Sequence, residues 1–115
     1  MKIITDKILV GEIKEMANKM FGNLVKAVVD TEKEVMAIDS ELHADAQALL
    51  LESGSKQENL WGINIYPEKE KIDEDFIEFD SVINIRPSQQ NRSRGIDSPE
   101  IREKILKIVN KLVQK

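Results

Sequence analysis

The chain has 115 residues, a formal net charge of −4 and no cysteine. This length fits a single domain, residues 1–115, that buries roughly 65% of the surface its unfolded chain exposes. The missing cysteine excludes disulfides, thiolate nucleophiles and cysteine-ligated zinc, and it fits a reducing cytoplasm. The net negative charge argues against a protein that coats nucleic acid non-specifically. The apolar runs are too short for a signal peptide or a membrane span.

The first element expected is an N-terminal helix. Apolar residues Leu9, Ile13, Met16 and Met20 recur at spacings of four, three and four, and Gly22 is a natural helix end. The following residues, 23–38, are rich in valine and alanine and predict two short strands around residues 31–33.

Residues 40–55 carry conflicting signals. Their alanine, leucine, glutamate and glutamine content favours a helix, with Ser40 as a possible N-cap. Within them, residues 42–50 alternate apolar and polar side chains, which favours a strand. We interpret residues 42–50 as a strand, with the helix as the alternative.

Two later segments share an Ile-Asn-Ile frame that ends in proline, GINIYP at 62–67 and VINIRP at 82–87. They lie in two predicted strands, residues 60–67 and 75–87, and each strand stops at its proline because proline cannot donate to a ladder. Side chains alternate along a strand. If the isoleucines face the core, then Asn64 and Tyr66 face away from it, and so do Asn84 and Arg86.

The last element is a helix with a clear beginning. Ser98 is an N-cap, Pro99 occupies the first helical position, and Glu100 follows where the helix dipole favours an acid. The connections between elements are short, which favours antiparallel pairing. The sequence therefore predicts an α+β fold of two layers, in which the N- and C-terminal helices pack on one face of a mostly antiparallel sheet of about five strands.

The outer face of this sheet is the first candidate site. His43 and Asp45 would lie about 7 Å apart on one strand, as a catalytic acid–base pair. With Glu78 or Asp80 they could also bind a metal, but a structural hydrogen bond between histidine and aspartate is more common, and we predict no metal site. The zinc deaminase pattern is excluded because it needs cysteines.

An arginine-rich loop is the second candidate. Residues 81–96 contain Arg86, Arg92 and Arg94 and no acid before Asp97. Arginine forks match phosphate and carboxylate groups, and the loop leads to a helix N-terminus, which favours anions. The alternative is a polar loop whose arginines pair with the acids of residues 68–80.

The stretches ELHADAQALLLESGSKQENLWG and INIRPSQQNRSRGIDSPEIREKI resemble an uncharacterised family of small archaeal and bacterial proteins, known only as a domain of unknown function. The likeness covers almost the whole chain. It implies a small, stand-alone cytoplasmic domain in a prokaryote, and it brings no activity, cofactor or catalytic residue.

The residues themselves favour one function. We expect a small ligand bearing phosphate or carboxylate, held by Arg86, Arg92 and Arg94, oriented by Asn64, Tyr66 and Asn84, with His43 and Asp45 available for proton transfer. The alternative is a protein-interaction module, a homodimer formed through the open sheet face or the final helix, without catalysis. RNA binding by the arginine loop is a third possibility that the net charge opposes.

Overall fold

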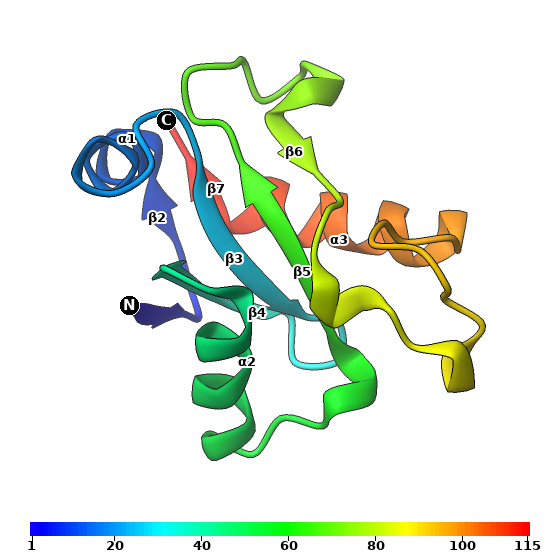
Figure 1. Ribbon diagram of the computed structural model, residues 1–115. Coiled ribbons are helices and arrows are strands. Elements are labelled where there is room, and N and C mark those ends of the chain that lie inside the picture. Colours follow the sequence, from blue (N-terminus) through cyan, green and yellow to red (C-terminus); the bar gives the residue numbers. More distant parts are fainter.

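The computed structural model describes all 115 residues and has an α+β fold (Figure 1). The helices are α1 (Val10–Lys19), α2 (His43–Glu52) and α3 (Pro99–Leu112). The strands are β1 (Lys2–Ile4), β2 (Ile8–Leu9), β3 (Val25–Asp30), β4 (Val35–Ser40), β5 (Leu60–Ile65), β6 (Ile77–Glu78) and β7 (Val113–Gln114). Four short 3₁₀ turns are η1 (Gln57–Asn59), η2 (Glu74–Phe76), η3 (Val82–Asn84) and η4 (Pro87–Gln89).

The main sheet has five strands in the order β1-β4-β3-β5-β6, and all its pairings are antiparallel. A separate parallel pair, β2 with β7, joins the two ends of the chain. The predicted fold class and the antiparallel sheet of about five strands are confirmed. None of the helices has the length and apolar character that crossing a membrane would require.

Each face of the sheet buries its own apolar cluster. Alternate residues of β5 divide between them, so that Trp61, Ile63 and Ile65 join the larger cluster while Leu60 joins the smaller one. The larger cluster contains the buried residues of α1 and α3, which confirms that the two terminal helices share one face. The smaller cluster is covered by Ala46 and Leu50 of α2.

The prediction of a strand at residues 42–50 is wrong, because residues 43–52 form α2. The buried residues His43, Ala46 and Leu50 recur at spacings of three and four, which is one side of a helix. Helix propensity therefore outweighs the alternating pattern. The sheet still has five strands because β1 pairs with β4 at the edge.

The second Ile-Asn-Ile segment is also not a strand. Residues 82–84 form the turn η3 and residues 87–89 form η4, and the chain leaves the sheet after the two residues of β6. The Ser81 side chain accepts a hydrogen bond from the Ile83 N–H at 3.3 Å, and Pro87 begins η4. Local side-chain bonds of this kind compete with a strand ladder, which the sequence pattern does not reveal.

Gly62 is where the second face is packed most tightly. A Cβ atom built on this residue would lie 2.6 Å from the Ser81 Cβ and 3.2 Å from the His43 Cδ2. The missing side chain thus lets η3 and the start of α2 approach the backbone of β5.

We predict that Gly62→Ala destabilises the fold by about 2–3 kcal/mol, because the new methyl group overlaps Ser81 in a packed site. Gly11→Ala is the matched control. Gly11 lies inside α1 with nothing within 4 Å of a built Cβ, so the same change there should stabilise by roughly 0.5–1 kcal/mol. Urea unfolding of both variants measures the difference; equal effects at the two positions would contradict the close packing at Gly62.

Candidate functional site

Side chains of residues 84–89 close the edge of β5. β6 pairs only with Asn64 and Ile65, so the first half of β5 has no strand on that side. Asn84 takes its place: its Oδ1 accepts the Gly62 N–H at 2.8 Å, and its Nδ2 donates to the Gly62 carbonyl at 3.0 Å. The same Nδ2 donates to the Arg94 carbonyl at 3.0 Å. In Figure 1 this segment, in yellow, runs beside β5 on the side away from β3.

Arg86 closes the same edge of β5 at Leu60, two residues before Gly62. Its guanidinium donates to the carbonyls of Leu60 and Gln57, the latter at 2.6 Å, and it lies over the Trp61 ring with 4.1 Å to the ring centroid. Gln89 extends the row, since its Nε2 donates to the Glu58 carbonyl at 3.0 Å. Burial lowers the pKa of Arg86. Asn84 and Arg86 were predicted to face a ligand on an open sheet face; instead they hold a loop against the strand edge.

The three arginines of the loop do not converge. Arg86 is held against Trp61, whereas Arg94 pairs with Asp80 through an Nε–Oδ1 contact of 2.6 Å. Arg92 is exposed, and its backbone N–H donates to Asp97, which also accepts the Ser93 hydroxyl at 2.7 Å. The arginines therefore form no common cradle for an anion.

A row of four polar residues crosses the sheet on the face that α2 covers. Ser40 on β4 is the register partner of Lys26 on β3, Lys26 is the partner of Asn64 on β5, and Asn64 is the partner of Glu78 on β6. Residues directly opposite one another on paired strands share a face. We call these four residues the polar row. Of them, sequence reasoning missed Ser40, because cross-strand register cannot be read from one chain.

Hydrogen bonds link one end of the polar row to its neighbours. The Glu78 Oε1 accepts the Asn64 Nδ2 at 2.8 Å and the Tyr66 hydroxyl at 2.9 Å. Desolvation and the Glu78 carboxylate together raise the pKa of Tyr66. The hydrogen bond and charge of Asp80 raise the pKa of Arg94. Asn64 and Tyr66 thus share a face as predicted, although both side chains already donate hydrogen bonds to the Glu78 carboxylate.

Two buried atoms of the polar row have no hydrogen-bond partner. They are the Oγ of Ser40 and the Oδ1 of Asn64, in residues that are 3% and 6% exposed. A buried polar atom without a partner costs about 1–3 kcal/mol. Lys26 lies between these two residues in the register, so both flank the one cation of the row.

His43 begins α2 and is 7% exposed. Its Nε2 lies 2.8 Å from the Ile63 carbonyl oxygen. Because a carbonyl only accepts, the Nε2 carries the proton and the Nδ1 of the neutral ring keeps its lone pair. Burial lowers the pKa of His43; the hydrogen bond to Ile63 opposes this shift, and the positive charge of Lys26 adds to it.

The predicted pairing of His43 with Asp45 fails because both lie on a helix. Residues that are two positions apart on a helix direct their side chains to nearly opposite sides. Asp45 lines a groove of about 360 Å³ together with Asp39, Glu41, Glu52 and Ser40. No group of three or more histidine, aspartate or glutamate side chains is placed to hold a metal ion.

The geometry defines a small α+β domain with a polar row on the α2 face of its sheet. A family model described as a protein of unknown function, DUF5674, matches residues 2–112, so the chain belongs to that family. The resemblance to a family of unknown function is thereby confirmed. No curated protein and no solved structure matches the chain.

We predict that lowering the pH from about 7.5 to about 5.5 destabilises the protein. The folded pKa of His43 lies below the ordinary histidine value of 6.5, so the unfolded chain binds more protons in this window and stability decreases as the pH is lowered. Carboxylates titrate mainly below it. His43 is the only histidine, so one ring resonance in an NMR titration reports its pKa directly.

His43→Gln is the matched control, because its side-chain amide can still donate to the Ile63 carbonyl but does not titrate. Its stability should be nearly flat across the same pH window. A His43 resonance that titrates at or above 6.5 would contradict the buried, neutral ring.

Proposed function

We propose that the chain binds a small ligand bearing a carboxylate or phosphate, and that the site is the polar row beside the N-terminus of α2 rather than the arginine loop. The observation that supports this most strongly is the pair of unpartnered buried atoms, Ser40 Oγ and Asn64 Oδ1, on either side of Lys26. Buried polar groups normally have partners, and a ligand would supply them.

Lys26 is the cation available for the anionic group. It has no carboxylate within ion-pair distance, and its ammonium lies 5.3 Å from the centroid of the exposed Phe21 ring. A ligand anion would pair with this ammonium and accept a hydrogen bond from the Ser40 hydroxyl. Charge-assisted bonds of this kind are roughly twice as strong as neutral ones.

The beginning of α2 adds to the attraction for an anion. The helix has ten residues, and its N-cap, Leu42, provides no side-chain hydrogen bond. The first N–H groups of a helix lack intrahelical partners, and the helix dipole favours negative charge beside them. His43 at this end is hydrogen-bonded to the Ile63 carbonyl, and the next residue of β5, Asn64, is the register partner of Lys26.

The rest of the ligand would be polar and would carry hydrogen-bond donors. Asn64 Oδ1 accepts a hydroxyl or amine, and the Nδ1 lone pair of His43 can accept a second one. His43 is also the proton acceptor if a reaction occurs there. Glu78 and Asp80 bring two negative charges close by, which disfavours RNA or another long polyanion.

The test is an NMR titration with inorganic phosphate, acetate and glycerol phosphate as probes. We expect the amides of Lys26, His43 and Ala44 to shift, with the largest response to glycerol phosphate because it combines an anion with hydroxyl donors. Lys26→Gln should weaken binding at least about tenfold through loss of one charged hydrogen bond.

Arg92→Gln is the matched control, because it removes one exposed cation from the arginine loop and leaves the polar row intact. Its affinity for the probes should equal that of the unaltered chain. Absence of shifts with all three probes would contradict the proposal. Weaker binding in Arg92→Gln but not in Lys26→Gln would also contradict it, because that result indicates that the arginine loop is the binding site.

A further inference from the structure

The polar row carries one cation and one carboxylate, and the two do not pair with each other. Lys26 and Glu78 lie on either side of Asn64 in the register, two strands apart. Neither forms an ion pair with any side chain of the protein. Lys26 is half-buried and Glu78 is exposed, so solvent reaches both. The row therefore presents a positive and a negative group with a neutral amide between them.

The amide of Asn64 is oriented so that its oxygen is left without a donor. Its Nδ2 lies 2.8 Å from the Glu78 Oε1 and 3.4 Å from the Asp80 carbonyl oxygen, and both of these atoms only accept. The nitrogen must occupy this side of the amide, and the Oδ1 is therefore the buried atom with no partner. This oxygen needs a donor, and it belongs to the same side chain that binds the Glu78 carboxylate.

An ammonium group satisfies Asn64 and Glu78 together, whereas a hydroxyl group satisfies only the amide. An ammonium carries three N–H donors and a positive charge, so it can donate to the Asn64 Oδ1 while its charge pairs with Glu78. The Glu78 Oε1 already accepts from Asn64 and from the Tyr66 hydroxyl, so the second carboxylate oxygen is the one that faces the new donor.

From these features we infer that the ligand of the polar row is a small zwitterion, with a primary ammonium as well as a carboxylate or phosphate. The inference rests on the proposed function, because the anionic group takes the place described there, at Lys26 and Ser40. The ammonium lies at Asn64 and Glu78. Neighbouring strands are about 4.8 Å apart, so the two charged groups of the ligand are separated by about one strand spacing. Amino acids and aminoalkyl phosphates combine these groups.

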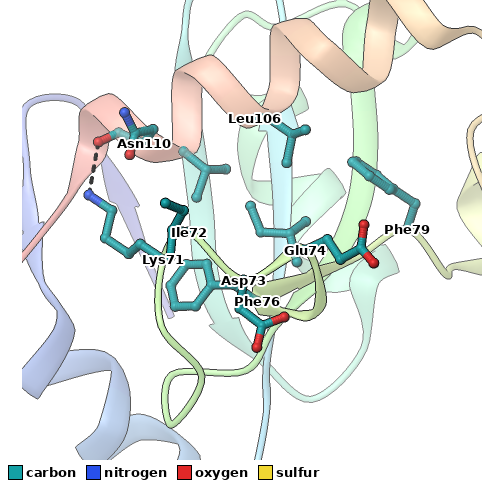
Figure 2. Close-up of a pocket in the computed structure, with 10 residues that line it drawn as sticks. Lys71, Ile72, Asp73, Glu74, Phe76, Phe79, Leu106 and Asn110 are labelled. Carbon is teal, nitrogen blue, oxygen red and sulfur yellow. Dashed lines mark hydrogen bonds between the residues drawn. The ribbon is translucent and has the colours of Figure 1, made fainter.

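An apolar groove on the other face of the sheet does not offer the same pair of charges. It lies between α3 and residues 71–79 and has a volume of about 410 Å³. Its one lysine, Lys71, donates to the carbonyls of Asn110, at 3.2 Å, and Val113 (Figure 2). That ammonium is already hydrogen-bonded, whereas the ammonium of Lys26 lies over the Phe21 ring. A zwitterion is therefore expected at the polar row and not in this groove.

The test is an NMR titration with two matched pairs of probes, glycine against glycolate and ethanolamine phosphate against ethylene glycol phosphate. Within each pair an ammonium replaces a hydroxyl. We expect the ammonium member to bind at least about fivefold more tightly in one pair or both, which is the effect of one ion pair. The pair that shows the preference identifies the anionic group as carboxylate or phosphate.

Glu78→Gln should abolish this preference, because its amide oxygen can still accept from Asn64 and Tyr66 but carries no charge. Its affinity for the hydroxyl members should not fall. Glu15→Gln is the matched control, since Glu15 is an exposed carboxylate on α1, on the other face of the sheet, and the preference should persist there. Dispersed amide spectra of both variants verify that they remain folded.

Equal affinity for the two members of both pairs overturns the inference and leaves the anion site of the proposed function in place. A preference that survives in Glu78→Gln overturns it as well. Absence of binding by all four probes contradicts the inference and the proposed function together. Methylammonium that binds as tightly as glycine also overturns the inference, because it indicates a site for cations alone.

Discussion

The side chain of Asn84 replaces a missing strand. β5 has only two residues paired with β6, and the Gly62 N–H and carbonyl beyond them would otherwise face an unpaired edge. Asn84 donates to one of these groups and accepts from the other, as a backbone unit does in an antiparallel ladder. It is 0% exposed, and both of its hydrogen bonds to Gly62 are buried. An open strand edge invites pairing with other chains, and this side chain prevents it.

The rest of the second face depends on this bond. Asn84 fixes η3 above Gly62, where the missing Cβ makes room for Ser81 and for the His43 ring. The Nδ2 of Asn84 also binds the Arg94 carbonyl, so the returning part of the loop is tied to the same point. Arg94 in turn pairs with Asp80, beside Glu78 and Asn64. A bond that serves the fold thus determines the surroundings of the polar row.

The sequence predicts the parts of this fold that depend on apolar period and helix caps. α3 begins where Ser98 and Pro99 indicate, and β5 alternates as its isoleucines require. Two predictions failed for physical reasons. In residues 42–50 an accidental alternation competed with strong helix propensity, and in residues 82–87 side-chain hydrogen bonds replaced a ladder.

The candidate site was predicted in part. His43, Asn64 and Tyr66 lie on the α2 side of the sheet, and Arg94 joins them through Asp80. The roles of Asn84 and Arg86 could not be foreseen, because a side chain that binds a strand edge has the same sequence signature as one that faces a ligand. Ser40 is opposite Lys26 because a β-bulge shifts the register near Lys26, and no local sequence pattern indicates such a bulge.

Hydrogen exchange at the Gly62 amide tests the central claim most directly. In the unaltered chain this amide should exchange as slowly as those of Ile63 and Ile65. It should lose that protection in Asn84→Ala, which removes the acceptor of the Gly62 N–H. Fast exchange of Gly62 in the unaltered chain, or unchanged protection in Asn84→Ala, would show that the Asn84 side chain does not close the edge of β5.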